Sequence, residues 1–168
     1  VRTAINHVST EAKNLVYQKN DDIVEGYELV VTLDKRTSSI CRNLPHGKVY
    51  GIGEGPLPPL HPNCRTTTAP VISSEFDFLD VGGKRAARGA DGGTQVDADT
   101  SYYEFLQMQP AWFQDEALGP VRGNIFRNSG MTAEEFRAAS VDGFGRPLTL
   151  REMADNDKRV AKFLSGNS

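Results

Sequence analysis

The sequence has few of the features that mark a secreted or membrane protein. It contains only two cysteines in 168 residues, which argues against a scaffold built on disulfides. No window holds the roughly 18 consecutive apolar residues that a membrane-spanning helix needs. The first residues lack the basic, apolar and small-residue segments of a signal peptide. An initiating Met is also lacking, so we expect a fragment or a processed form.

An excess of charge of one sign is lacking as well. The chain has 19 Lys and Arg residues against 22 Asp and Glu, a net charge of −3 that is spread evenly. Because no segment forms a basic arm, composition makes no case for strong nucleic-acid binding, although a local basic face remains open. With 38% hydrophobic and 24% charged residues, the chain is too apolar for a disordered tail and too polar for a membrane protein.

Residues 1–81 have the pattern of a small domain that mixes helix and strand. An apolar face recurs with helical spacing over residues 3–19, where Thr3 can cap the helix: Ile5, Val8, Ala12, Leu15 and Val16. Apolar and β-branched runs predict strands near residues 26–33, 48–52 and 65–72. In the first strand, either Leu29, Val31 and Leu33 or the alternate set should be buried. Four prolines between residues 56 and 62 exclude regular structure there.

The rest of the chain divides into a connector and a helical region. Residues 82–99 hold five glycines and no aromatic residue, so we interpret them as a flexible linker or an exposed loop, with an ordered loop held on the surface as the alternative. Three capping boxes predict helix starts in residues 100–168, at Ser101–Glu104, Thr132–Glu135 and Thr149–Glu152. The expected fold is therefore α+β: a small mixed domain with a few short strands, a Gly-rich connector and an all-helical C-terminal region.

Residues 33–70 hold both cysteines and two of the three histidines. The His61-x-x-Cys64 spacing is a plausible metal half-site, and Cys41 could add a third ligand. Ser38 stands where a Cys-x-x-Cys partner of Cys41 would be, so a fourth ligand is missing. Three alternatives stay open: a metal site, a Cys41–Cys64 disulfide, or a knot held by hydrogen bonds. We expect Cys41 and Cys64 to lie close together without stoichiometric metal, because structural zinc sites usually have four protein ligands.

Asp34 and Arg36 follow the end of the first predicted strand. A carboxylate and a guanidinium at such a place can bind a phosphate-bearing substrate or act in catalysis. We favour the simpler interpretation, an ion pair between Asp34 and Arg36 that organises the loop, with Thr37 as a local cap. Trp112 and Phe113 are interpreted as a core anchor or a partner-docking point rather than a platform for stacking bases.

The order of these motifs resembles the phage head morphogenesis family, the Mu F-like minor head proteins. The resemblance covers about 70 residues from Arg2-Thr3 onward and includes the strand Gly26-Tyr27-Glu28-Leu29-Val30. The remaining matching residues are Leu33, Asp34, Arg36, Thr37, Ser38, Cys41, Gly47, Lys48, Val49, Tyr50, Pro58, Pro59, His61, Pro62, Asn63, Cys64, Arg65 and Thr66. Residues 101–150 also resemble the helical C-terminal extension of one subgroup.

Two departures from the family pattern stand out. Many relatives have a Cys where this chain has Ser38, which gives them a four-ligand Cys-x-x-Cys…His-x-x-Cys set. The turn before Lys48 is His46-Gly47, where Asp-Gly is common. Full-length relatives usually carry a further N-terminal helical region, so we expect this chain to lack one.

The resemblance implies a minor capsid protein of a tailed phage or prophage, without enzymatic activity and without a required cofactor. Such a protein binds the portal protein and other head proteins, contacts packaged DNA only indirectly, and does not involve a membrane. It is expected in the virion head interior or portal region, and in the host cytoplasm during assembly. The alternative is a toxin-like nuclease or nucleotidyl- or ADP-ribosyl-transfer enzyme that uses Asp34, Arg36, His61 and Cys64.

Overall fold

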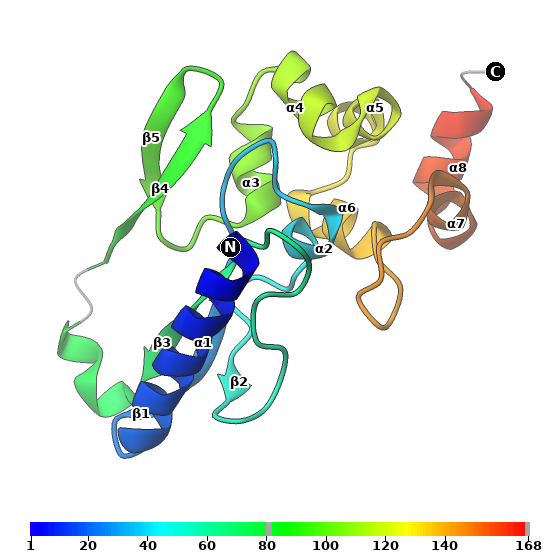
Figure 1. The fold of residues 1–168 in the computed structure, drawn as a ribbon. Helices are drawn as coiled ribbons and strands as arrows, with labels where there is room; N and C mark the ends of the chain where they lie inside the picture. The colour runs from blue at the N-terminus through cyan, green and yellow to red at the C-terminus, as the bar shows by residue number, and fades with distance from the viewer. Residues whose placement is uncertain (80–81, 167–168) are drawn as a thin grey trace.

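The computed structural model describes residues 1–79 and 82–166, and it has the α+β architecture expected from the sequence (Figure 1). The helices are α1 (Arg2–Lys19), α2 (Ser39–Arg42), α3 (Tyr102–Gln107), α4 (Ala111–Leu118), α5 (Pro120–Asn128), α6 (Ala133–Ala139), α7 (Leu150–Asn156) and α8 (Lys158–Ser165), with a 3-10 helix, η1 (Ser74–Leu79). The strands are β1 (Val24–Val30), β2 (Tyr50–Gly51), β3 (Thr67–Ile72), β4 (Lys84–Gly89) and β5 (Gly92–Asp97). None of the described helices is long and apolar enough to cross a bilayer. The expected boundary after residue 81 falls partly outside the described residues.

A three-stranded antiparallel sheet of order β2-β1-β3 forms the N-terminal half. The sequence placed these strands correctly, although β2 is only two residues long. Side chains alternate between the two faces along β1 and the residues that follow it. Of the two alternating sets that the sequence allowed, the buried one contains Leu29, Val31 and Leu33. The proline-rich residues 56–62 have no regular structure, because proline cannot donate a backbone hydrogen bond.

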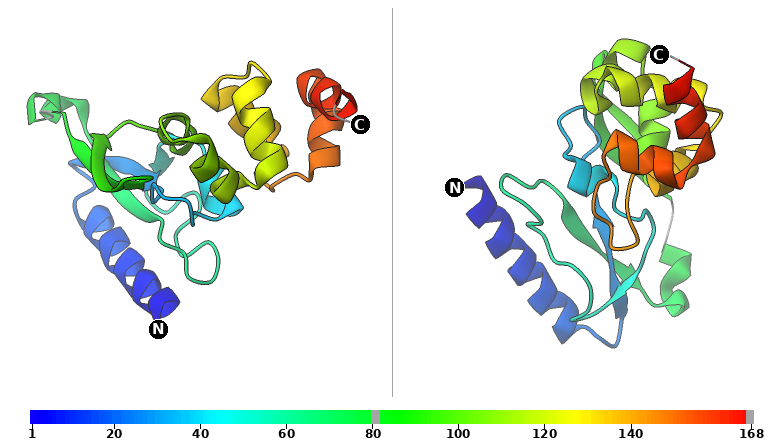
Figure 2. Two further views of the ribbon diagram at one scale, coloured as in Figure 1. Left: turned by 90° about the horizontal axis from the view of Figure 1, so that it is seen from above. Right: turned by 90° about the vertical axis from the view of Figure 1, so that its right-hand side faces the viewer.

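Helix α1 lies beside the sheet (Figure 2). The apolar face found in the sequence is exposed, and the opposite face of the helix packs inward. Asn6 Nδ2 donates to the carbonyl of Cys64 at 3.0 Å, and Lys13 Nζ donates to Thr67 Oγ1 at 2.6 Å. The apolar face forms the α1 stripe, whose members are all exposed: Ile5, Val8, Ala12, Leu15 and Val16. The helix also begins at Arg2 rather than after Thr3, whose hydroxyl instead accepts a hydrogen bond from the backbone N–H of Asn63.

The glycine-rich residues 82–99 form a β-hairpin rather than a flexible linker. Strands β4 and β5 pair antiparallel in continuous register from Lys84–Asp97 to Gly89–Gly92. The hairpin is also attached to the rest of the molecule, because the N–H of Arg88 donates to the carbonyl of Leu33 at 2.8 Å. The prediction of a flexible linker is therefore wrong, because amino-acid composition alone does not reveal which backbone groups pair with one another.

Helices α3 to α8 confirm the all-helical region after residue 100. All three predicted capping boxes are present, at Ser101, Thr132 and Thr149. The last predicted helix is divided into α7 and α8 at Asp157, whose side chain accepts the N–H of Arg159 and caps α8. One buried cluster joins both halves, because Leu33, Cys41 and Cys64 pack in the same core as Phe105 and Phe113.

Candidate functional site

The motif residues come together where two loops meet at the end of the sheet. The first loop follows β1 and leads through Asp34 into α2, which Ser38 caps by accepting the N–H of Cys41. The second loop contains His61 and Cys64 and leads into β3. The first loop leaves β1 and the second enters β3, and these two strands are antiparallel neighbours. Both loops therefore lie at the same end of the sheet, where their motif side chains face one another.

The carboxylate of Asp34 is buried and fully engaged. Arg65 binds it in a bidentate ion pair, through Nη2 to Oδ1 at 2.8 Å and through Nη1 to Oδ2. The backbone N–H of Arg36 donates to Oδ1 at 2.9 Å, and the Thr37 hydroxyl lies 3.3 Å from the same atom. Burial alone would raise the pKa of Asp34, but the hydrogen bonds from Arg65, Arg36 and Thr37 lower it below its usual value.

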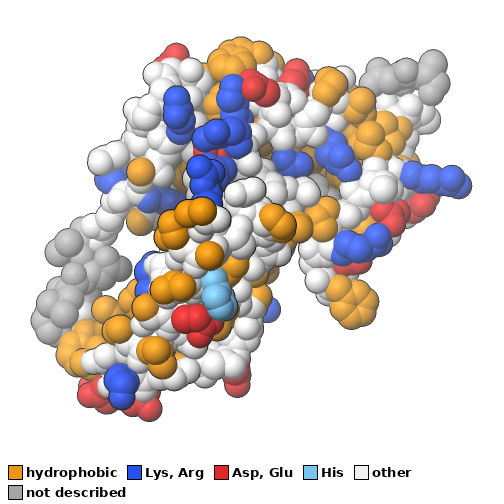
Figure 3. Space-filling view, in the orientation of Figure 1, with side chains coloured by type: hydrophobic (Ala, Val, Ile, Leu, Met, Phe, Trp, Pro, Cys, Tyr) orange, Lys and Arg blue, Asp and Glu red, His pale blue; other side chains and the backbone are white. Residues whose placement is uncertain are grey.

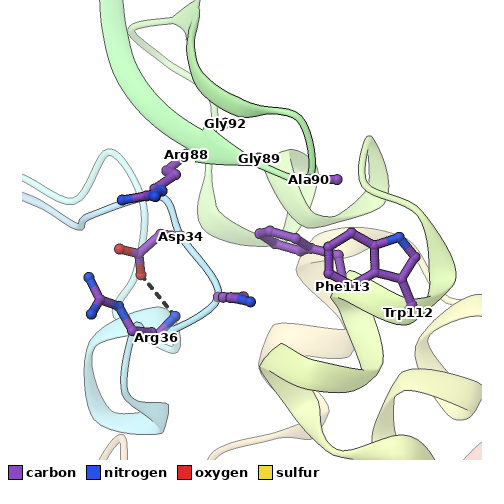
Figure 4. Close-up of a pocket in the computed structure, with 9 residues that line it drawn as sticks. Asp34, Arg36, Arg88, Gly89, Ala90, Gly92, Trp112 and Phe113 are labelled. Carbon is purple, nitrogen blue, oxygen red and sulfur yellow. Dashed lines mark hydrogen bonds between the residues drawn. The ribbon is translucent and has the colours of Figure 1, made fainter.

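The ion-pair partner of Asp34 is therefore Arg65, and the expected pairing with Arg36 is wrong. Arg36 contributes only its backbone N–H, the contact dashed in Figure 4, because its exposed side chain makes no ion pair with the carboxylate within the described residues. Arg65 was recognised as a motif residue, yet nothing in local spacing linked it to Asp34, which lies 31 positions earlier. Thr37 is not the cap expected of it, because Ser38 caps α2; the hydroxyl of Thr37 instead donates to the carbonyl of Thr32 at 2.6 Å.

Cys41, His61 and Cys64 form a second cluster beside this ion pair. Their ligand atoms all lie within 4.8 Å of one another, with 3.7 Å between the two Sγ atoms and 3.1 Å between Cys41 Sγ and His61 Nε2. Both thiols are free and buried. Burial raises the pKa of the Cys41 thiol, and hydrogen bonds with Thr66 and Ser38 offset only part of that effect.

The contacts of His61 define its tautomer. Its Nδ1 lies 2.8 Å from the carbonyl of Pro62, which can only accept, so Nδ1 carries the proton. Nε2 is therefore an acceptor, and the hydroxyl of Ser38 at 2.8 Å can donate to it. The sulfur of Cys41 lies 3.1 Å from the same nitrogen, so its thiol and the Ser38 hydroxyl compete for one lone pair.

The three side chains have the ligand types and the spacing that a thiophilic cation such as zinc prefers. The distance of 3.7 Å between the sulfurs is close to the edge, about 3.8 Å, of a tetrahedron with 2.3 Å Zn–S bonds. Only three strong protein ligands are present among the described residues, and the nearby Ser38 offers a neutral hydroxyl. A structural zinc site usually has four, so the absence of stoichiometric metal stays a prediction that elemental analysis can test.

The other motif residues support the loops. Gly47 is exposed and has φ of +65°, a conformation that glycine adopts without strain, at the turn before β2. Pro59 follows a cis peptide bond to Pro58 in the loop that carries His61. The two residues of the predicted docking point have different surroundings: Phe113 is buried in the core and 2% exposed, whereas Trp112 is 54% exposed.

Residues of the helical region that the sequence did not single out hold the first loop in place. Tyr102 donates its hydroxyl to the carbonyl of Asp34 at 3.0 Å, and Tyr103 donates to Asn43 Oδ1 at 2.6 Å. Arg137 donates to the carbonyl of Asn43 at 3.1 Å. Two adjacent tyrosines between the two members of a capping box are a weak signal for this role, because a buried tyrosine usually needs a partner for its hydroxyl.

Comparisons with known proteins do not extend this description. No protein-family model matches the chain, and neither a curated protein nor a solved structure matches it. The resemblance to Mu F-like minor head proteins therefore depends on the motif residues themselves.

Proposed function

We propose that the chain is a minor head protein of a tailed phage or prophage, which binds the portal protein and other head proteins during assembly, packaging or delivery of DNA. The observation that carries this proposal is the α1 stripe. According to this proposal, the protein acts in the head interior or portal region without a cofactor, and it contacts packaged DNA only through other proteins.

The α1 stripe has the spacing of a surface that packs against another helix. Ile5, Val8, Ala12 and Leu15 follow one another at intervals of three, four and three residues, which is the a/d pattern of a helical seam. Four of the five stripe side chains are between 56% and 67% exposed. The inward face of α1 is already used by contacts to β3, so the stripe is not needed to hold the domain together. Contiguous exposed apolar surface of this kind favours a protein partner.

The motif side chains support an architectural role rather than catalysis. Asp34 is held by Arg65, and Cys64 is only 1% exposed. The cavity that Arg36, Cys41 and His61 line has a volume of about 30 Å³, room for one or two waters rather than a substrate. An enzyme that uses Asp34, Arg36, His61 and Cys64 would need these groups to converge in an open cleft.

The proposal is tested by affinity purification of the tagged chain from a host in which the phage is replicating. We expect the portal protein and other head proteins to copurify with the wild type. The double variant Val8→Glu/Leu15→Glu should lose them, and Ser9→Glu, on the same exposed side of α1, should retain them. Circular dichroism confirms that the variants fold.

Two outcomes contradict the proposal. The chain can purify without head proteins, or the double variant can keep the same partners as the wild type. If the stripe instead joins two copies of the chain, size-exclusion chromatography will show an oligomer that the double variant loses, and the assembly proposal will fail.

A further inference from the structure

A separate pocket of about 350 Å³ lies between the Asp34 loop, the tip of the β4–β5 hairpin and the start of α4. Its lining includes Lys35, Arg36, Arg88, Trp112 and Phe113. Neither the proposed assembly function nor the motif resemblance uses Arg88 or the hairpin. The volume falls in the range of small-molecule sites and accommodates one nucleotide.

One side of the pocket is cationic. Figure 4 shows Arg36 and Arg88 on either side of Asp34, with Phe113 and Trp112 across the pocket from them. Both arginines are exposed, and within the described residues neither guanidinium has a carboxylate partner. Figure 3 shows Lys and Arg side chains gathered between the hairpin and the N-terminal end of α1. This local charge stands out because the whole chain has a net charge of −3.

Asp34 does not cancel this charge. Both of its oxygens accept hydrogen bonds from Arg65, so the charge of the carboxylate is already compensated by a cation that does not line this pocket. Lys35 is also paired, because its Nζ lies 2.7 Å from Glu116 Oε1. The unpaired cations are therefore Arg36 and Arg88, whose planar guanidinium groups suit the oxygens of a phosphate.

The other side of the pocket is aromatic. The indole of Trp112 is about half exposed, and it rests edge-on against the buried ring of Phe113, with 5.7 Å between the ring centroids. The Nζ of Lys35 lies 5.8 Å from the centroid of the Trp112 ring, which helps to hold the indole in position. An exposed aromatic side chain beside two arginines without carboxylate partners is suited to stacking a planar base while its phosphate is bound.

The walls of the pocket are connected to one another. The backbone N–H of Arg88 bonds to the carbonyl of Leu33 beside Asp34. At the hairpin tip, the N–H of Ala90 donates to Gln109 Oε1 at 2.9 Å, directly before α4. The side chains that would meet a ligand are therefore presented by a preorganised frame, which lowers the entropic cost of binding.

We propose that this pocket binds a nucleotide, with the phosphate between Arg36 and Arg88 and the base against Trp112. The nucleotide can be free or part of a single strand, since both present the same phosphate and base. An acidic peptide shares the negative charge but lacks a base that would stack on the indole, so it fits the pocket less well. The inference is independent of the proposed assembly function.

Trp112 is the only tryptophan of the chain, so its fluorescence reports this site alone. We expect AMP and oligo(dT) each to quench it saturably, whereas adenosine, which lacks the phosphate, should bind at least about tenfold more weakly. Affinity that rises with the length of oligo(dT) identifies a single strand as the ligand. Equal affinity for AMP and oligo(dT) identifies the free nucleotide.

The variant Arg36→Gln/Arg88→Gln should lower the affinity at least about tenfold, because it removes both charges and leaves the backbone bonds intact. Arg151→Gln provides the matched control, since Arg151 is exposed on α7 outside the pocket and should not matter. Calorimetry with Trp112→Phe, which keeps a stacking ring, and Trp112→Ala, which does not, separates stacking from charge. The phenylalanine variant should bind better than the alanine variant.

Several results would overturn the inference. One is the absence of saturable quenching by both AMP and oligo(dT). Another is unchanged affinity in the double arginine variant while its thermal unfolding matches the wild type. Displacement of AMP by polyglutamate at equal charge concentration would assign the pocket to acidic peptides instead.

Discussion

Arg65 organises the motif loops because it is the only cation among the described residues that pairs with buried Asp34. Its guanidinium spans the distance between the two loops and binds both carboxylate oxygens. A bidentate pair of this kind restricts geometry more than a single contact does. The Asp34–Arg65 pair therefore sets the spacing of the loops that carry Cys41 and Cys64.

Replacing Asp34 with Asn should destabilise the protein rather than remove an activity. The substitution removes the charge that compensates Arg65 while keeping the shape, so we expect the free energy of unfolding to fall by about 2–3 kcal/mol. Asp97→Asn is the control, because the Asp97–Lys84 pair is exposed and should contribute under about 1 kcal/mol. Urea denaturation measures both, and equal stability of the two variants would contradict the prediction.

The same pair predicts a pH dependence. Hydrogen bonds hold the pKa of Asp34 below its usual value in the folded protein, so its contribution is present above the unfolded pKa of about 3.9. It is lost as the pH falls through the folded pKa, when the carboxylate becomes protonated. At neutral pH the free energy of unfolding should therefore be lower in Asp34→Asn than in the wild type. As the pH falls, this free energy should decrease less steeply in the variant, which denaturation at a series of pH values measures.

Oxidation should join Cys41 to Cys64. The two sulfurs lie 3.7 Å apart on residues separated by 23 positions, and a disulfide closing a loop of that length is worth about 3 kcal/mol in the chain-entropy description. We expect a mild oxidant to remove both reactive thiols and raise the thermal midpoint, with Cys64→Ser as the control that shows neither effect. Thiols that remain titratable after oxidation of the folded protein would contradict this.

At the scale of elements, the accuracy of the sequence-based predictions depends on how local each signal is. The three capping boxes were located correctly because each involves side chains only three residues apart. The apolar face of α1 was recognised but not its exposure, because apolar periodicity alone cannot show that Asn6 and Lys13 would find carbonyl and hydroxyl partners near β3. The Asp34–Arg65 pair was missed because its members lie 31 positions apart.

The hairpin had a usable signal that composition obscured. Asp91-Gly92 lies between two short runs, and Asp-Gly is a preferred dipeptide in hairpin connections. Its neighbouring strands contain Lys, Arg, Gly and Thr rather than large apolar residues, so their alternation is weak. Backbone bonding to Leu33, the hydrogen bonds of Arg85 to Val31 and Thr100, and the burial of Ala87 hold β4 in place, and residue composition reveals none of these contacts.

The hairpin turn should depend on Gly92. This residue has φ of +109°, which side chains disfavour, and no atom near it would obstruct a Cβ. Gly92→Ala should lower stability by about 1–2 kcal/mol through backbone strain alone. Gly93→Ala is the matched control, because Gly93 has equally open surroundings without positive φ, and thermal unfolding of the two variants decides the matter.

On the scale of the whole molecule, the loops at the end of the N-terminal sheet share one buried cluster with the C-terminal helices, while Tyr17, Val24, Tyr27 and Leu29 form a second cluster at the sheet itself. Leu33, Cys41 and Cys64 from the first half pack with Phe105, Phe113 and other buried residues of the second. Tyr102 and Tyr103 add buried hydrogen bonds to the Asp34 loop and to Asn43. The helical region is thus an integral part of the structure that forms the motif cluster.

A chain ending at residue 99 should therefore fail to fold cooperatively. The truncation uncovers Leu33 and removes the partners of Asp34 and Asn43, so buried polar and apolar groups both lose their surroundings. We expect the full chain to unfold in one calorimetric transition and the truncated chain to show none. A sharp transition in residues 1–99 would instead indicate an independent N-terminal domain.

The hydrogen bonds of Tyr102, Tyr103 and Arg137 also impose an order on folding during synthesis. The groups that they satisfy on Asp34 and Asn43 lie 68, 60 and 94 positions earlier in the chain. A ribosome therefore releases the entire motif region well before its partners emerge, and contacts of such long range form slowly. Until residue 137 has left the exit tunnel, the two segments that carry Cys41 and Cys64 stay open to solvent, oxidants and chaperones, so this region is vulnerable in the nascent protein.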